Sequence, residues 1–233
     1  MTSYPSLKRG LAAGLTLGVI GVALFFVTRN AAEPNVAQGK KGDRQDWTMY
    51  GGSYARNMVN TVVKGLPAEW DVDEDKPVNI KWVQKLGSKS YGGPIVANGR
   101  VFIGTNNMNP RDPKYSQLVD GKPIDLGIVM CFDEAKGDFL WQAVHEKLPG
   151  GQVIDWPYEG ICSSPFVDGD RLYYVSNRCD VVCADVATGK AYWNFDMIGK
   201  LNVFPHNIAD GSPIVIKDQL YVVTSNGVHQ DHI

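Results

Sequence analysis

The sequence predicts an all-β fold of repeated four-stranded antiparallel units, preceded by one N-terminal transmembrane helix. Two recurring phrases predict the units: one ends in Trp and occurs twice, and the other contains Pro before an apolar strand and occurs three times. An uncharged apolar run near the N-terminus predicts the helix. These observations divide the 233 residues into a membrane segment (1–28), a polar tether (29–45) and a repeat domain (46–233).

The phrase that ends in Trp occupies residues 131–141 and 183–193. In both copies a Cys is followed by Asp two positions later, by Gly four positions after the Asp, and by Trp four positions after the Gly. Strand-forming residues on both sides of a Gly turn are typical of a β-hairpin. Each copy therefore predicts two strands, the second of which ends in a large aromatic side chain.

The second phrase lies upstream of the first and occupies residues 93–103, 164–175 and 212–223. Each copy begins with Gly-Pro or Ser-Pro, passes through a polar turn and ends in an apolar strand. With the hairpin phrase this gives four short antiparallel strands per unit, which is typical of a β-propeller blade. A propeller needs about four to eight blades to close, whereas residues 46–233 supply about three units and the start of another. We therefore expect a partial β-propeller.

The spacing of the second phrase predicts an insertion in the first unit. The repeated Pro stands at positions 94, 165 and 213, so the first interval is much longer than the second. Residues 105–114 and 120–123 are rich in Pro, Asn, Asp and Gly, which favours a loop between the second and third strands of that unit. Long loops on a rigid scaffold often carry function.

The apolar run spans residues 11–27, follows Lys8 and Arg9, and contains no charge. Its length is at the short end for a spanning helix and beyond a typical signal-peptide core. We therefore expect an uncleaved signal anchor that contacts the membrane through residues 10–28. A cleaved signal peptide remains the alternative. The polar composition of residues 29–45 predicts a flexible tether.

The charge differs on the two sides of the tether. Residues 1–46 carry six Lys and Arg against three Asp and Glu, and the remaining domain carries 17 basic and 22 acidic residues. A mildly acidic domain without a basic stripe argues against nucleic acid as a partner.

The four cysteines fall into two groups. Cys131 and Cys183 occupy the same position of the repeated phrase, so we expect buried thiols that act as small apolar residues. Cys162 and Cys179 would approach each other if the strands around residues 164–176 pair, and a disulfide between them is left open. Zinc is a weaker interpretation of Cys179 and Cys183, because no His is close in sequence.

The two copies of the hairpin phrase resemble the bacterial PQQ-like β-propeller repeat proteins. This family includes quinoprotein dehydrogenases and the lipoprotein scaffold of outer-membrane protein assembly. Trp82 looks like the end of a preceding unit, and residues 46–57, with Trp, two Gly and an Arg-Asn pair, look like the opening that introduces the first strand. The resemblance covers roughly residues 46–227. It is specific for the fold and says little about activity, because the repeat is a packing motif.

The resemblance implies that Trp141 and Trp193 are structural and pack across the gap between neighbouring blades. It also implies that active enzymes of this family hold PQQ with a calcium ion, a carboxylate base and a Trp, often beside a disulfide between adjacent cysteines. This chain has no adjacent Cys pair, and its motifs offer no calcium-binding set. We therefore assign no catalytic, cofactor-binding or metal residue. Binding of PQQ with calcium is expected only if the complete protein is an active quinoprotein.

The remaining site candidates are histidines and one loop. His206 lies between units, where it could face a channel mouth, and His145 is expected at the surface. His229 and His232 could suggest a metal pair but lack a helix that would align them. The loop 150–160 has the composition of a ligand-facing rim and also of an ordinary loop between blades; its carboxylates and aromatics are Asp155, Trp156, Tyr158 and Glu159.

We expect a membrane-anchored propeller that acts as a protein-interaction scaffold, in the cytoplasmic membrane with its domain facing the periplasm. The alternative is the N-terminal fragment of a PQQ-dependent alcohol or sugar dehydrogenase, so whether the complete protein is an enzyme stays open. A third interpretation is a subunit that completes its sheet on a larger membrane complex. The incomplete ring itself is explained either by a fragment of a longer protein or by closure with another chain.

Overall fold

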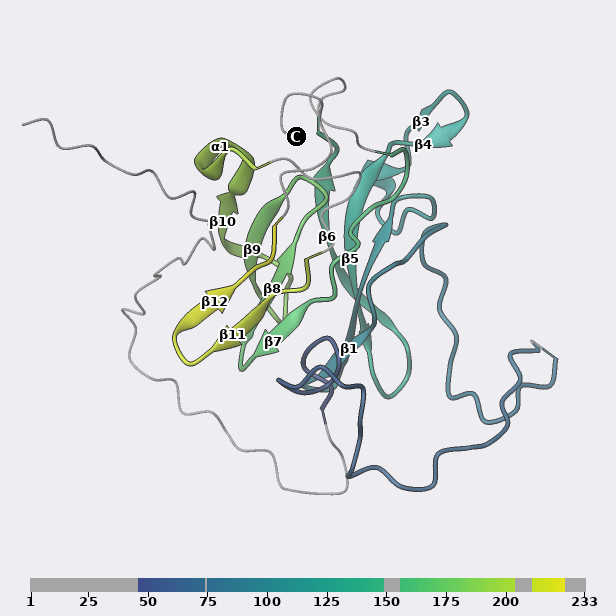
Figure 1. Ribbon diagram of the computed structural model, residues 1–233. Coiled ribbons are helices and arrows are strands. Elements are labelled where there is room, and N and C mark those ends of the chain that lie inside the picture. The colour runs from purple at the N-terminus through teal and green to yellow at the C-terminus, as the bar shows by residue number, and fades with distance from the viewer. Residues whose placement is uncertain (1–45, 74, 149–155, 204–210, 225–233) are drawn as a thin grey trace, which may run out of the picture.

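The computed structural model describes residues 46–73, 75–148, 156–203 and 211–224 (Figure 1). The first unit is a four-stranded antiparallel sheet with strand order β1-β2-β5-β6. The strands β3 and β4, which lie between β2 and β5 in the chain, are not part of it. Its strands are β1 (Ile95–Ala97), β2 (Arg100–Asn106), β5 (Leu126–Asp133) and β6 (Phe139–Glu146).

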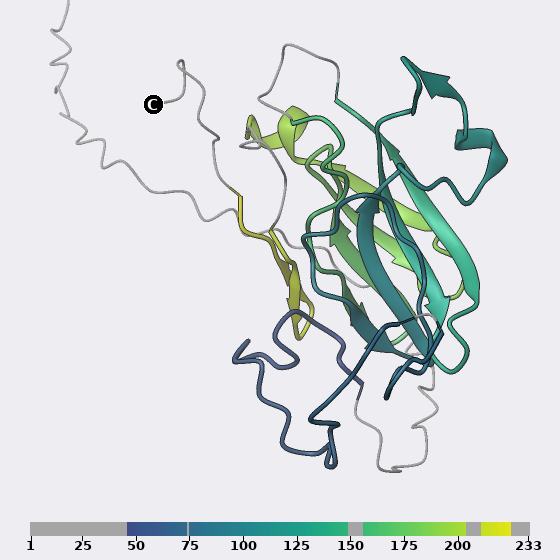
Figure 2. The same ribbon diagram turned by 90° about the vertical axis from the view of Figure 1, so that its right-hand side faces the viewer.

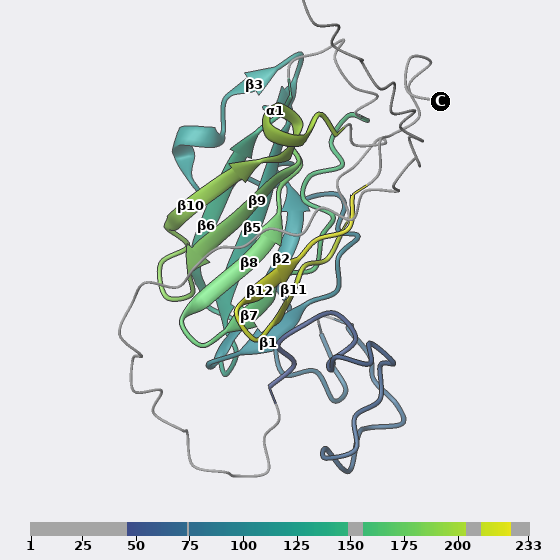
Figure 3. The ribbon, with the colours of Figure 1, turned by 60° about the vertical axis from the view of Figure 1, so that its left-hand side comes forward.

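The second unit repeats this topology, again with four antiparallel strands and order β7-β8-β9-β10. Its strands are β7 (Phe166–Asp168), β8 (Arg171–Val175), β9 (Asp180–Asp185) and β10 (Ala191–Asp196). The short helix α1 (Met197–Leu201) follows, and β11 (Ile214–Ile216) then pairs with β12 (Gln219–Tyr221) beside β7 (Figure 3). The two predicted four-stranded units are confirmed, and β11 and β12 are the described strands of a third.

The predicted insertion lies between β2 and β5. It contains the 3₁₀ helix η1 (Pro113–Tyr115) and a small hairpin of β3 (Leu118–Val119) and β4 (Lys122–Pro123). At the hairpin turn Asp120 and Gly121 both have positive φ, of 52° and 76°, which is the geometry that Asp-Gly turns favour. The hairpin projects beyond the end of the first sheet (Figures 1 and 2).

Burial follows the position of each strand in its sheet. In β5 every residue from Leu126 to Phe132 is buried, because this inner strand has a sheet neighbour on each side and packed layers on both faces. In the outermost strand β10 partly buried and exposed residues alternate. The apolar runs of the central strands and the alternation at the edge are therefore set by what covers each face.

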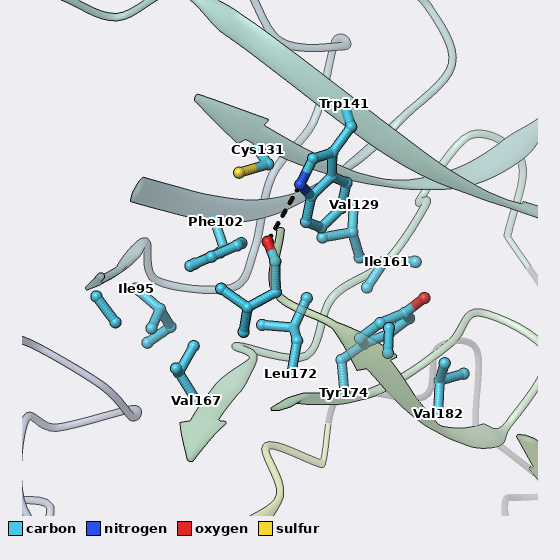
Figure 4. Close-up of a cluster of buried hydrophobic side chains, with 13 residues drawn as sticks. Ile95, Phe102, Val129, Cys131, Trp141, Ile161, Val167, Leu172, Tyr174 and Val182 are labelled. Atoms are coloured by element: carbon cyan, nitrogen blue, oxygen red, sulfur yellow. Dashed lines mark hydrogen bonds between the residues drawn. The ribbon is translucent and has the colours of Figure 1, made fainter. Parts of the chain in front are cut away.

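The largest core cluster fills the space between the first two sheets (Figure 4). Phe102 and Val129 of the first unit face Leu172, Tyr174 and other residues of the second, and most of these side chains are completely buried. Burying an aromatic or branched side chain of this size contributes about 2–3 kcal/mol. This interface makes two neighbouring units one packed body.

One contact is made twice across successive units. The Trp141 indole Nε1 donates to the carbonyl of Val186 at 3.2 Å, and its ring lies against Gly189 (Figure 4). Trp82 Nε1 donates to the carbonyl of Glu134 at 2.9 Å, and its ring lies against Gly137. In both cases the acceptor follows the Asp of the next hairpin phrase and the ring covers the Gly of that phrase. The predicted packing of Trp on the neighbouring blade is confirmed for Trp141.

Trp193 has a different environment among the described residues. Its ring lies 6.2 Å from that of Tyr173 on its own unit and packs against Leu220 and Val222 of the third unit. Its structural role is therefore confirmed, and its contact with a further hairpin phrase is not among those described.

The N-terminal phrase bonds all three units, beginning with the first strand. Trp47 exchanges two backbone hydrogen bonds with Val96 of β1, and the carbonyl of Thr48 accepts from Val167 of β7. Farther along, the Tyr54 hydroxyl donates to the carbonyl of Val215 in β11 at 3.1 Å. The phrase therefore pairs with the first strand, β1, and its backbone and side chains also bond the innermost strands of the other two units.

All four cysteines are buried, and no disulfide joins them. Cys131 and Cys183 are completely buried, as predicted. The bond left open between Cys162 and Cys179 is not made. The Cys162 thiol lies 3.8 Å from the carbonyl oxygens of Glu159 and Gly160, whereas Cys179 packs with Val175 and other residues of a separate cluster.

The predicted anchor (1–28) and tether (29–45) lie outside the described residues. Among the helices that the structure does describe, none has the length and apolar character needed to cross a bilayer.

A Gly189→Ala variant tests the contact between Trp141 and the neighbouring hairpin. Gly189 has a φ of +71°, and a Cβ there would lie 2.4 Å from Cε3 of the Trp141 ring. Gly169 is the matched control, since its φ is +60° and a Cβ there would have no heavy atom within 4 Å. Both variants should lose about 1–2 kcal/mol from backbone strain, and Gly189→Ala should lose about 1–3 kcal/mol more from the clash. Urea unfolding measures the difference, and equal losses would contradict it.

Candidate functional site

A pocket of about 420 Å³ opens at the end of the sheets that carries the insertion. Three segments line it: the loop before β1, the insertion between β2 and β5, and the loop before β7. The lining residues are Ser88, Lys89, Met108, Lys122, Trp156, Pro157, Tyr158 and Glu159. This volume is in the range of pockets that hold small ligands or single side chains.

Glu159 is a buried carboxylate with its own partners. Only 4% of the residue is exposed, and it forms an ion pair with Lys89. Burial alone would raise the pKa of Glu159, but hydrogen bonds from Lys89 and from the Tyr91 hydroxyl outweigh it and hold the pKa below its ordinary value. The same hydrogen bond raises the pKa of Lys89. Glu159 is therefore ionised and already hydrogen-bonded to Lys89 and Tyr91.

Tyr158 has an unusual backbone that its neighbours hold in place. Its φ is +58°, a conformation that a non-glycine residue adopts at a cost of about 1–3 kcal/mol. The Tyr158 amide donates to Oδ2 of Asp125 at 2.9 Å, and its carbonyl accepts from Nδ2 of Asn106. Both partners come from the first unit, so the neighbouring blade holds the Tyr158 backbone in this conformation.

The next residues bring the same loop close to β2. Gly160 has a φ of +72°, and a Cβ there would lie 2.3 Å from the carbonyl oxygen of Thr105. The carbonyl of Thr105 also accepts from the amide of Ile161 at 3.1 Å. Glycine is required at this position because the two backbones touch.

Charges around the pocket form two pairs and leave one cation. Lys89 pairs with Glu159, and Lys147 Nζ lies 2.8 Å from Oδ2 of Asp125 while it donates to the carbonyl of Trp156. Lys122 Nζ lies 5.5 Å from the centre of the Tyr158 ring. It has no carboxylate partner in the described ranges, so the described groups at the pocket carry a net charge of about +1.

The structure brings together part of the loop that the sequence singled out. Trp156, Tyr158 and Glu159 line the pocket, whereas Asp155 lies outside the described residues. Sequence reasoning missed Lys89 and Tyr91, because nothing in the segment before the first Gly-Pro marks a partner for a carboxylate 70 positions away. It also missed Lys122, although the Asp-Gly turn beside it was recognised as a loop.

The histidines are not part of this pocket where they are described. His206, His229 and His232 lie outside the described residues. His145 is in β6, partly buried, and its Nε2 lies 2.8 Å from the Tyr174 hydroxyl of the second unit. The expectation of a surface His145 is wrong, because β6 extends to Glu146 and carries the ring into the contact between the two sheets.

Residues 125–231 match a protein-family model described as outer membrane protein assembly factor BamB. The matched segment begins at β5 and contains both hairpin phrases with the Trp141 contact. The matched segment, somewhat under half of the chain, has the repeat of the PQQ-like β-propeller proteins. No curated protein matches the chain significantly in sequence.

Solved structures similar to this PQQ-like propeller include BamB from Moraxella catarrhalis, with 18% identity and a TM-score of 0.41. That match covers 62% of this chain and 37% of the other. Quinohemoprotein alcohol dehydrogenase from Comamonas testosteroni is 14% identical with a TM-score of 0.43, over 74% of this chain and 22% of the other. The chain thus spans well under two thirds of either structure.

Calcium-bound PQQ does not fit the described groups of the pocket. Within the described ranges no three His, Cys, Asp or Glu side chains converge on one point. The one buried carboxylate of the pocket, Glu159, already bonds Lys89 and Tyr91. A calcium ion there would compete with an ammonium group for the same oxygens, so we derive no chemistry through this cofactor from these residues.

A Lys89→Met variant tests whether Glu159 depends on its ammonium partner. Without Lys89 the buried carboxylate loses its largest stabilising contact, so the pKa of Glu159 should rise. A group with a lowered folded-state pKa stabilises the protein above its unfolded pKa, and that stability disappears as the pH falls. Acid unfolding of Lys89→Met should therefore begin at a higher pH, as followed by circular dichroism. The double variant K89M/E159Q should reverse the change, and a double variant as acid-sensitive as K89M would contradict the pairing.

His145 predicts a second loss of stability on acidification, with a different physical cause. Burial, with the nearby charge of Arg178, lowers the pKa of His145 from 6.5 to about 4. The unfolded chain therefore binds a proton that the folded protein does not, and stability should fall as the pH drops from about 6.5 to about 4. The loss should be on the order of 2–3 kcal/mol. Urea unfolding across this range should show a shallower pH dependence for His145→Gln, which keeps a hydrogen-bonding group but does not titrate. The same slope in both proteins would contradict the assignment.

Proposed function

We propose that the protein is a protein-interaction scaffold, held at the outer face of the cytoplasmic membrane by residues 10–28, with its propeller domain in the periplasm. The fold and the repeat type support a role in binding, since the family model matched over residues 125–231 is described as an outer membrane protein assembly factor. The partner is a protein, and the mildly acidic domain disfavours nucleic acid.

The observation that carries this proposal is the division of groups around the pocket. The buried polar groups bond one another: Glu159 with Lys89, and Asn106 with the Tyr158 backbone. Apart from Lys122, the groups left on the rim are apolar or aromatic: Trp156 lines the pocket and is 55% exposed, and Leu118 on the adjoining hairpin is 60% exposed. Exposed aromatic and apolar side chains of this kind often form the contacts between protein partners.

The projecting hairpin adds to this surface. Leu118 and Val119 of β3 are adjacent and both exposed, and β4 carries Lys122 into the pocket wall. A partner that contacts the hairpin would therefore also lie over the pocket. Burying one exposed Leu side chain contributes about 1.5–3 kcal/mol to such an interface.

The competing function is that of a PQQ-dependent alcohol or sugar dehydrogenase of which this chain is the N-terminal part. That enzyme would reduce a dye with an alcohol or a sugar once PQQ and calcium are added. The scaffold would do neither and would hold a protein partner at the hairpin. The two functions are thus separated by a crosslinking assay for a protein partner and a dye-reduction assay, both made on the protein as it exists in its native host.

The first assay places a photo-crosslinking amino acid at Leu118 in the membrane-bound protein of its native host. A crosslinked protein partner is expected at Leu118 and not at the control position Tyr192, which is 52% exposed on the far strand β10. The double variant L118D/V119D, probed from position 156, should reduce the yield about fivefold or more, because it places charge in an apolar contact. Equal yields from positions 118 and 192 would contradict a specific partner.

The second assay adds PQQ and calcium to the protein purified from its native host and follows dye reduction with ethanol or glucose. The scaffold proposal expects no reduction above the rate without protein. Reduction that depends on PQQ, calcium and substrate would replace the scaffold with the dehydrogenase.

A further inference from the structure

We propose that the pocket beside Tyr158 binds an organic monocarboxylate with an apolar or aromatic body. Lys122 pairs with the carboxylate, and Trp156 and Tyr158 contact the body. The ligand site goes beyond the scaffold function and does not depend on it. It rests on the charge count, the backbone and the exposed aromatic surface of the described pocket.

The first step is the unmatched cation. Of the three described lysines around the pocket, Lys89 and Lys147 each lie against a carboxylate, whereas among the described groups Lys122 has only the face of the Tyr158 ring, 5.5 Å away. An ammonium group over an aromatic face gains about 0.5–1 kcal/mol at an exposed site, less than a charge-assisted hydrogen bond can give. An anion that reached Lys122 would therefore be bound without breaking either of the two ion pairs.

The net charge sets the kind of anion. One unmatched ammonium balances one negative charge, so a monocarboxylate leaves the site neutral. A phosphate dianion would leave excess negative charge close to Glu159, which is ionised. No Arg lines the described pocket to offer the paired donors that phosphate recognition usually employs.

The apolar walls set the body of the ligand. Trp156 is 55% exposed although it lies in a concave site, and Pro157, Met108 and the Tyr158 ring stand around the same space. Covering such surface favours binding by roughly 25 cal/mol for each Å² removed from water. A flat or aromatic body can also stack on the Trp156 ring.

The strained backbone at Tyr158 indicates a preorganised site. A Tyr with φ of +58° is kept in this conformation by Asp125 and Asn106 from the other unit. Asp125 is itself held by Lys147, which also donates to the Trp156 carbonyl. One network thus fixes both aromatic residues of the pocket, and a site fixed in this way loses less entropy when it binds.

The test compares phenylacetate with phenylacetamide, its neutral analogue, on the full 233-residue chain. Binding is followed by the NMR shift of the Trp156 indole N–H, which is assigned with a Trp156→Phe variant. Phenylacetate should bind in the millimolar range, as expected for a ligand of about ten heavy atoms, and about fivefold more tightly than the amide. Inorganic phosphate should not displace it. Equal affinity for the acid and the amide would overturn the proposal, as would displacement by phosphate.

Lys122→Gln separates the charge from the shape of the pocket. The side chain is exposed on the hairpin, so the variant should unfold at the same urea concentration as the wild type. It should lose the preference for phenylacetate over phenylacetamide and keep the affinity for the amide. Lys190→Gln, which removes an exposed lysine of the second hairpin phrase, should change nothing. An acid preference that survives Lys122→Gln would overturn the role of Lys122.

Two peptides identify the source of the carboxylate. N-acetyl-Ala-Phe is offered with a free C-terminal carboxylate and as its C-terminal amide. If the free peptide binds several-fold more tightly than phenylacetate, the ligand is the C-terminus of a protein. If phenylacetate binds at least as well, the ligand is a small metabolite. Both results support the carboxylate site, and binding of the two peptides with equal affinity would argue against it.

Discussion

The arrangement of the units depends on one interaction, the packing of a Trp indole on the Gly turn of the next unit. Trp141 on Gly189 and Trp82 on Gly137 use the same atoms in the same way, with the indole N–H bonded to the carbonyl after the Asp. The turn must be Gly because the ring occupies the place of a Cβ. The hydrogen bond adds direction to an apolar contact, so each unit is fixed in angle as well as in distance.

The N-terminal segment fastens the opposite end of the same units. Its backbone bonds β1 and β7 near the turns that follow these strands, and Tyr54 reaches β11. The insertion, which lines the pocket, lies at the other end of the sheets (Figure 1). Because the Trp contacts and this segment supply the cohesion, the loops at the pocket end are free to adopt a strained conformation such as that of Tyr158.

The strands were predictable from sequence because each phrase carries its own periodicity and turn residues. Residues 131–141 and 183–193 form hairpins, and the long first interval is an insertion between β2 and β5. Contacts between distant segments were not predictable. The pairing of Glu159 with Lys89, the bond from His145 to Tyr174 and the path of residues 46–57 depend on how whole sheets meet, and local patterns carry no information on that. The disulfide between Cys162 and Cys179 was left open for the same reason: the strands between them do pair, but the Cys162 thiol lies by the carbonyls of Glu159 and Gly160 and Cys179 packs with Val175.

The repeated positions serve the packing of the units, and this explains where a binding site can lie. The repeated positions are fully engaged: Asp closes the hairpin turn, Gly receives an indole, Trp supplies it and Cys fills the strand interior. A change at any of these positions disturbs a neighbouring unit, so they are poor places for a binding site. The segments outside the repeated phrases do not make these packing contacts. Three such segments, the insertion and the loops before β1 and β7, line the pocket. The pocket therefore lies where the packing rules of the propeller leave the sequence free to recognise something else.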